Sequence, residues 1–195
     1  VLLTGPEPDS NWKRFAATFG DLAQQLGVSR FVGLGAYPFA APHTRDARLS
    51  ITTPSATLAA TLSWLKSTLD VPAGLNSVLE HTCHDLDLEA LGLWAQVPHY
   101  VSGMPYPAAA AALVEGLCTF SGLEIPTGEL RREARLQQGR IDQLVAGNEE
   151  HEAMVRQLET AWDAAATATL PNPDQLPSAD ELAAEVERFL RGQAD

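Results

Sequence analysis

The sequence has 195 residues, of which 45% are hydrophobic, and this length suffices for one sizeable core. Its 13 lysines and arginines stand against 25 aspartates and glutamates, which gives a net charge of -12 and disfavours nucleic acid or an anionic membrane surface as a partner. No apolar run reaches the ~18 to 20 residues of a membrane span. Two cysteines, Cys83 and Cys118, are too few for a disulfide scaffold. These features predict an acidic, cytoplasmic protein without nucleic-acid or membrane partners.

The first third of the chain predicts a parallel sheet. The apolar run Val1–Gly5 is typical of a buried strand, and because no methionine or polar segment precedes it, we expect an N-terminal portion before Val1. Ser10 is placed to cap an amphipathic helix over residues 12–26, where apolar residues recur every three or four positions. A second strand is predicted at Arg30–Gly35. Strand, helix and strand at this spacing predict a right-handed crossover between parallel strands.

Further elements follow at similar spacing. The sequence predicts a third strand over residues 49–52, a helix over residues 55–68 and another buried strand over residues 91–97. The segment 76–89 fits either a helix or a strand followed by a helix. An alanine-rich helix of high propensity is predicted over residues 108–121.

Beyond Pro126 the pattern changes to two long polar helices, over residues 128–145 and 148–167, with no strand between them. Each carries a narrow apolar stripe, so the pair predicts a helical hairpin that packs on a partner surface. Ser178 is placed to cap a last helix. We expect three parts: an α/β core in residues 1–125, a helical hairpin appendage in residues 126–170, and a linker with a core-docking helix in residues 171–195.

The segment from Glu80 to Asp87 holds several side chains that bind metals elsewhere. In a helix His81 and His84 share a face while Cys83 points away from it, and the sequence has no second Cys or His pair to complete a four-ligand site. We therefore expect no metal. The sequence also lacks the glycine patterns of dinucleotide sites, P-loops and nucleophile elbows, so we expect no cofactor.

Segments that follow the predicted strands are the best candidate site, because ligands of parallel α/β sheets bind at the carboxyl ends of the strands. His43 and His99 could transfer protons, and Arg45 could bind an anion. The structural alternative is that the histidines hydrogen-bond backbone carbonyls and that the arginine forms an ion pair. Gly33 and Gly35 could admit a ligand or, equally, a packed helix.

At these segments the sequence resembles the proteasome assembly chaperone 2 family, in the branch typical of actinobacteria. The resemblance covers residues 1–135, and Asp46 stands where a proline is expected. The matching residues are Leu2 to Asp9 with Trp12, Val32 to Gly35 through Ala41 to Arg45, and Val97 to Tyr100 followed by Tyr106 to Ala110.

The resemblance implies a three-layer α/β/α core with a mainly parallel sheet, similar in topology to nucleoside phosphorylases, together with a helical appendage and a trimeric state. It also implies that the first strands precede Val1. Members outside this branch act as chaperones for proteasome assembly. The residues that we predict to bind a ligand or partner are Thr4, Gly5, Asp9, Gly33, Gly35, Thr44, Tyr100 and Tyr106.

Two functions remain open at this point. The sequence carries no complete catalytic signature, which favours an interaction or assembly protein that binds proteasome-related proteins through its appendage and sheet edges. The alternative is a phosphorylase- or hydrolase-type enzyme that uses His43, Arg45 and His99 on a small anionic substrate. Topology alone does not decide between them.

Overall fold

The structure is a computed structural model that describes residues 1–62, 65–66 and 74–167. Residues 1–159 form one compact unit, and a second unit begins at Thr160. The predicted linker and last helix, residues 171–195, lie outside the described residues. Within the described ranges, no helix is long and apolar enough to cross a membrane.

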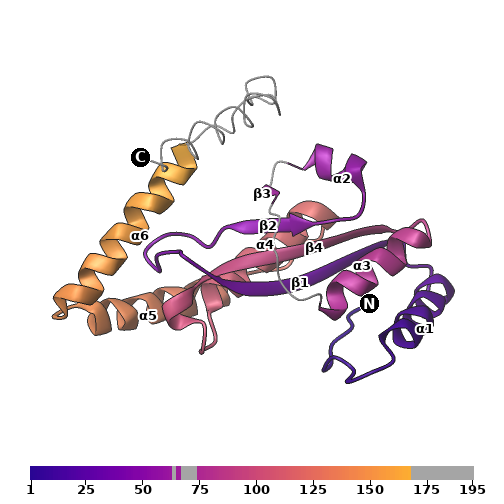
Figure 1. Ribbon diagram of the computed structural model, residues 1–195, viewed down its shortest axis with the longest axis horizontal. Helices are drawn as coiled ribbons and strands as arrows, with labels where there is room; N and C mark the ends of the chain where they lie inside the picture. Colours follow the sequence, from indigo (N-terminus) through magenta and orange to yellow (C-terminus); the bar gives the residue numbers. More distant parts are fainter. Residues whose placement is uncertain (63–64, 67–73, 168–195) are drawn as a thin grey trace, which may run out of the picture. The chain divides into compact units, whose positions relative to one another are not determined.

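Strands and helices are interspersed as far as the hairpin, with β1 followed directly by β2 (Figure 1). The strands are β1 (Arg30–Phe39), β2 (Leu49–Thr52), β3 (Leu65–Lys66) and β4 (Glu89–Pro98). The helices are α1 (Trp12–Gln25), α2 (Ala56–Thr61), α3 (Leu75–Asp85), the 3-10 turn η1 (His99–Val101), α4 (Pro107–Ser121), α5 (Gly128–Val145) and α6 (Glu149–Thr167).

The sheet is mixed and has the strand order β1-β4-β2-β3. β1 and β4 pair in parallel over ten positions, β2 is antiparallel to β4, and β2 is parallel to β3. A mainly parallel sheet is therefore not confirmed. The direction of β2 has a physical cause: residues 40–48 between β1 and β2 hold no helix, and a parallel crossover needs a dozen or more residues.

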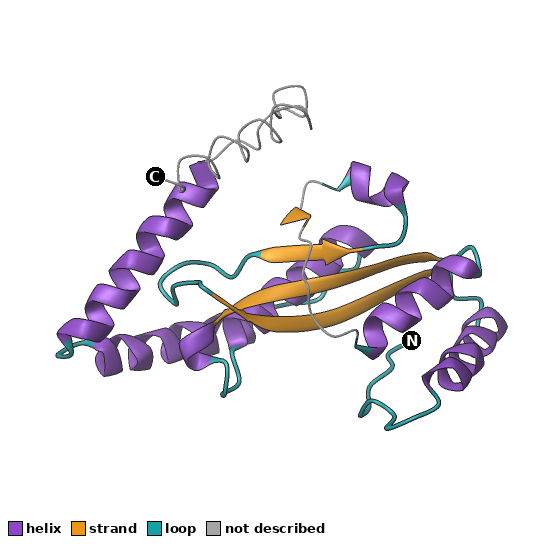
Figure 2. Ribbon diagram, in the orientation of Figure 1, coloured by secondary structure: helices purple, strands orange, loops and turns teal. Residues whose placement is uncertain are grey.

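Helices cover both faces of the sheet (Figure 2). Alternate residues of β4 point to opposite faces, so Leu93 and Ala95 belong to the core under α4 whereas Gly92 lies under α3. α1 packs beside α3 on that second face, where Phe19 and Phe31 meet edge to face with ring centroids 5.6 Å apart. The described part of the core is thus an α/β arrangement with a small sheet between helices.

The predicted strand at Val1–Gly5 is wrong. These residues form no strand, and Val1 and Leu2 are almost fully exposed. An apolar run forms a strand only where a neighbouring backbone pairs with it, and no described residue does so here. Side-chain contacts hold the following segment instead: Glu7 accepts a hydrogen bond from the Leu75 backbone N–H at 2.8 Å.

The predicted helix over residues 55–68 is wrong at Leu62, Leu65 and Lys66, while residues 63, 64, 67 and 68 lie outside the described residues. The Ser55 hydroxyl caps α2 by accepting a hydrogen bond from the Leu58 N–H at 3.2 Å, but Leu62 is already extended. Leu65 and Lys66 pair with β2 as a short strand. A helix of six residues is marginal by itself, so pairing with β2 determines the conformation of Leu65 and Lys66.

The predicted helices after residue 74 agree more closely with the structure. The open segment 76–89 is a helix, α3, that leads into β4. α4 begins with Pro107 at its first turn and ends at Gly122, whose φ of 75° suits glycine. Two helices follow within a residue of the predicted hairpin bounds. α5 packs on α4, and its Ile141 joins the core cluster of Ala95 and Ala109.

Candidate functional site

The imidazole of His43 is buried, and both of its nitrogens have partners. Nδ1 lies 2.6 Å from the Tyr100 hydroxyl, and Nε2 lies 3.0 Å from Asp142 Oδ1 on α5. The His43 backbone N–H also donates to the Tyr100 oxygen at 2.8 Å. The ring is therefore held from both sides, by Tyr100 and by Asp142. It links the β1–β2 loop to the hairpin.

The next two residues of the loop bind the second helix of the hairpin. Arg45 Nη1 lies 3.0 Å from Glu159 Oε1 on α6, and the Thr44 hydroxyl donates to the same oxygen. Arg45 Nη1 also donates to the Thr44 backbone oxygen at 3.4 Å. Consecutive side chains of one loop therefore hold both α5 and α6.

Arg131 of α5 completes the attachment. It donates to Asp46 Oδ1 at 3.3 Å and binds Glu115 of α4 through two nitrogens. The guanidinium holds the pKa of Glu115 below its usual value. Arg131 thus joins three elements of the molecule: the β1–β2 loop, α4 and α5.

The other candidate residues on this side lie around Tyr100. His99 is exposed, and its Nδ1 lies 3.3 Å from the Phe39 backbone oxygen, the contact expected under the structural alternative. The His43 and His99 rings each meet Tyr100 nearly at right angles, with centroids 5.7 Å and 5.4 Å away. Burial raises the pKa of Tyr100. Burial likewise raises the pKa of Tyr106 to about 12, so its hydroxyl keeps its proton.

The structure does not bring the remaining predicted residues to this place. Thr4, Gly5 and Asp9 are exposed in the segment before α1. Gly33 and Gly35 lie in β1, where the surfaces beside them are filled by the side chains of Asn76 and Trp94. These two side chains thus occupy the space beside the glycines. A role of Gly33 and Gly35 in binding stays a prediction.

A cavity of about 400 Å³ adjoins His43. Its lining contains groups that the sequence analysis missed, because they belong to the hairpin, far along the chain. Arg131, Arg135 and Gln138 recur at the spacing of one helix face, which is the signal that identifies them in retrospect. The lining residues are His43, Thr44, Arg45, Asp46, Tyr106, Ala108, Arg131, Ala134, Arg135 and Gln138.

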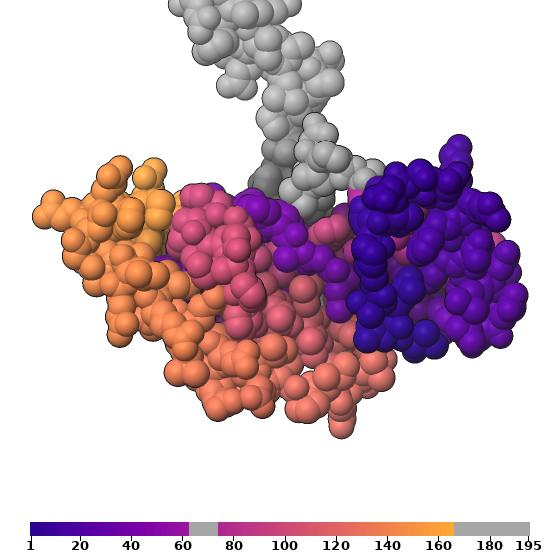
Figure 3. Space-filling view, turned by 90° about the horizontal axis from the view of Figure 1, so that it is seen from below, coloured from indigo at the N-terminus to yellow at the C-terminus, as the bar shows by residue number. Residues whose placement is uncertain are grey.

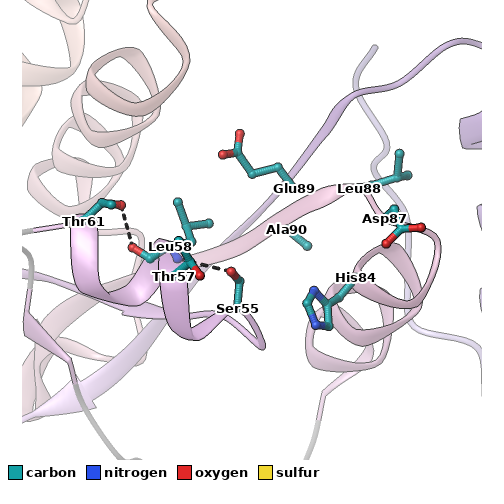
Figure 4. Close-up of a pocket in the computed structure, with 9 residues that line it drawn as sticks. All are labelled: Ser55, Thr57, Leu58, Thr61, His84, Asp87, Leu88, Glu89 and Ala90. Carbon is teal, nitrogen blue, oxygen red and sulfur yellow. Dashed lines mark hydrogen bonds between the residues drawn. The ribbon is translucent and has the colours of Figure 1, made fainter.

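A second hollow of about 390 Å³ lies between α2 and the end of α3 (Figure 4). His84 and Asp87 border it, whereas Cys83 is fully buried on another side of α3. The side chains of the segment 80–87 therefore diverge. Among the residues that the structure describes, no group of three or more metal-binding side chains gathers.

A buried carboxyl group lies on the other face of the sheet. Glu80 of α3 is 3% exposed and sits over Gly92. The Thr52 hydroxyl donates to its carboxylate at 2.9 Å and accepts from Trp94 Nε1 at 2.9 Å. Burial raises the pKa of Glu80 to about 7, and the hydrogen bond from Thr52 opposes part of that rise.

Comparison with known proteins shows which family the chain belongs to. The model of the PAC2 family matches residues 1–145. The chain belongs to the PAC2 family. No curated protein matches it.

Several solved structures are similar to this chain. A PAC2 family protein from Streptomyces avermitilis is 36% identical with a TM-score of 0.70, over 77% of this chain and 63% of that one. A Mycobacterium tuberculosis protein of unknown function is 34% identical with a TM-score of 0.77, over 84% and 57%. A proteasome-assembly chaperone homologue from Mycobacterium tuberculosis is 30% identical with a TM-score of 0.70, over 77% and 64%. This PAC2 chain thus spans about three-fifths of the length of these structures.

Proposed function

We propose that this PAC2 protein is an assembly factor that works by binding proteins, without catalysis, and that its partners are proteasome-related. The proposal rests on the contacts of the candidate catalytic residues. His43 and Arg45 bind the hairpin residues Asp142 and Glu159, so they hold an appendage in place. The likeness to a solved proteasome-assembly chaperone homologue supports the partner class.

The same geometry disfavours the enzymatic alternative. A general base needs an available nitrogen within reach of the substrate. Both ring nitrogens of His43 are hydrogen-bonded within the protein, and the side chain is 1% exposed. His99 is exposed, and its Nδ1 lies 3.3 Å from the Phe39 backbone oxygen. In both histidines, ring nitrogens are thus used in contacts within the protein.

The exposed side of the hairpin supplies an apolar surface for a partner. Leu136 and Leu144 of α5 are 57% and 74% exposed, and eight residues of separation puts them on one helix face. In the unit formed by residues 1–159, α5 and α1 lie at opposite ends (Figure 3). We infer that the appendage, residues 126–170, presents this face while residues 1–125 form the core that carries it.

The hairpin face gives the first test. Immobilised full-length chain is expected to capture purified proteasome subunits of the source organism. Leu136→Ser combined with Leu144→Ser should weaken that capture by ~10-fold or more, because truncating apolar anchors of an interface typically costs this much. The matched control is Leu123→Ser, an equally exposed leucine outside the hairpin. Equal capture by the double variant and the control, or no capture by the unchanged chain, would contradict the proposal.

We also infer, from the resemblance of the chain to its family, a nucleoside-phosphorylase-like core topology, a cytoplasmic location and a homotrimer. Light scattering of the purified chain tests the oligomeric state. The expected mass is three times the 20.9 kDa of one chain. A mass of 20.9 kDa across the micromolar range would rule out a trimer of this chain.

A further inference from the structure

We infer that the cavity between the loop at residues 43–46 and α5 binds a phosphate-type anion. The cavity has a volume of about 400 Å³, and three guanidinium groups line it, those of Arg45, Arg131 and Arg135. Of the residues that the structure describes, Asp46 is the one carboxylate in the lining. This site is separate from the exposed leucine face of α5, so the inference does not depend on the proposed partner.

Two of the three arginines are fixed by carboxylates. Glu159 holds Arg45 and Glu115 holds Arg131, which offsets their charges and keeps their side chains in place. Arg131 uses three of the five N–H donors of a guanidinium, through Nε, Nη1 and Nη2. One donor on each terminal nitrogen is left without a protein partner among the described residues.

Arg135 supplies a charge that no carboxylate in the described part of the chain offsets. It lies one turn after Arg131 on the same face of α5, and it forms no hydrogen bond or ion pair with any residue in the described ranges. Gln138, one turn further on, continues that face. A row of donors on one helix therefore borders the cavity.

Tyr106, just before α4, contributes a further donor to the lining. Its hydroxyl makes no hydrogen bond with a described residue, and it stays protonated because burial raises its pKa to about 12. The donors thus come from the β1–β2 loop, from α5 and from Tyr106. A tetrahedral group with several acceptor oxygens satisfies such a set, and arginine is the side chain best suited to bind it.

The same observations limit the class of ligand. Three guanidinium groups disfavour a cation, and the net charge of -12 disfavours a polyanion such as nucleic acid. A single phosphate-type group fits both limits. Because one wall is the β1–β2 loop and the other is α5, a bound anion would also strengthen the attachment of the hairpin to the core.

Calorimetric titration of the full chain with inorganic phosphate, at constant ionic strength, tests the site. Saturable binding is expected for the unchanged protein. Arg135→Gln should weaken it by ~10-fold or more, the effect of losing one charge-assisted hydrogen bond. The matched control Arg140→Gln alters another exposed arginine of α5 that does not line the cavity and should leave the affinity unchanged.

A second variant is expected to strengthen phosphate binding instead of weakening it. Asp46 is 93% exposed and competes for Arg131, so Asp46→Asn should strengthen phosphate binding roughly three- to tenfold without unfolding the protein. A parallel titration with acetate tests whether the site prefers a carboxylate, and acetate is expected to bind more weakly than phosphate. The inference is overturned by absent or non-saturable phosphate binding, by equal affinities of the Arg135→Gln and Arg140→Gln variants, or by acetate binding as tightly as phosphate.

Discussion

Replacing His43 by alanine is expected to lower the free energy of unfolding by about 2–4 kcal/mol. The substitution leaves a cavity at a buried site and removes hydrogen bonds to the Tyr100 hydroxyl and the Asp142 carboxylate. Urea denaturation followed by circular dichroism measures the change. His99→Ala is the matched control, because the same side chain is exposed there and makes one long contact with a backbone oxygen; it should change stability by no more than about 0.5 kcal/mol.

Hydrogen exchange locates the effect of the same substitution. Because His43 binds Asp142 on α5, amides of α5 should lose protection before those of β4, which lies in the centre of the sheet. A double-mutant cycle with Asp142→Asn should give a coupling energy of about 1 kcal/mol or more between the two side chains. Additive effects of the two substitutions, with α5 as protected as before, would show that His43 does not hold the hairpin. Under the enzymatic alternative, His43→Ala would instead remove turnover and leave stability unchanged.

The contribution of Glu80 to the free energy of unfolding is expected to fall by about 3 kcal/mol as the pH rises from about 4.5 to about 7. The cause is burial, which raises the pKa of Glu80 from 4.5 to about 7. Between these values the unfolded chain has lost the proton of Glu80 while the folded chain keeps it, so folding binds a proton and the free energy of unfolding decreases with pH. The full contribution is present below pH 4.5 and is lost as the pH passes 7.

Glu80→Gln isolates this contribution. Glutamine keeps the shape and can still accept the hydrogen bond from Thr52, but it does not ionise. The difference in unfolding free energy between the unchanged protein and this variant should therefore drift by about 3 kcal/mol between pH 4.5 and pH 8. Glu89→Gln, at the exposed ion pair with Arg30, is the control and should show a drift below about 1 kcal/mol. A flat difference for Glu80→Gln would show that the carboxyl group is hydrated in the folded protein.

Local patterns in the sequence predict the elements that make their own hydrogen bonds. Apolar spacing predicts α1 and the two hairpin helices, and alanine propensity predicts α4. The strand β4 is predicted by its continuous apolar run. Strand pairing is harder to predict from local patterns in the sequence. β1 continues past Gly35 through Pro38 to Phe39, because β1 is an edge strand among the described residues and a missing N–H on its outer side costs little. The antiparallel direction of β2 likewise depends on its pairing with β4, and no local sequence pattern predicts that pairing.

The candidate site shows the same division. Its loop is evident from the short motif around His43, because a loop after a strand is a local feature. Its partners, Asp142 and Glu159, are 99 and 114 or more positions away in the chain and look like ordinary surface acids of polar helices. Only the fold shows that the two carboxylates face that loop. The sequence thus predicts where the site lies and leaves open what the site binds.

The attachment of the hairpin through four consecutive loop residues, His43 to Asp46, has a consequence for exchanging parts between relatives. A transplanted hairpin that carries other side chains at positions 131, 142 and 159 would no longer match the recipient loop. Loop and hairpin would then have to be exchanged together. A chimaera with such a relative should keep its hairpin docked only when both segments come from the same donor.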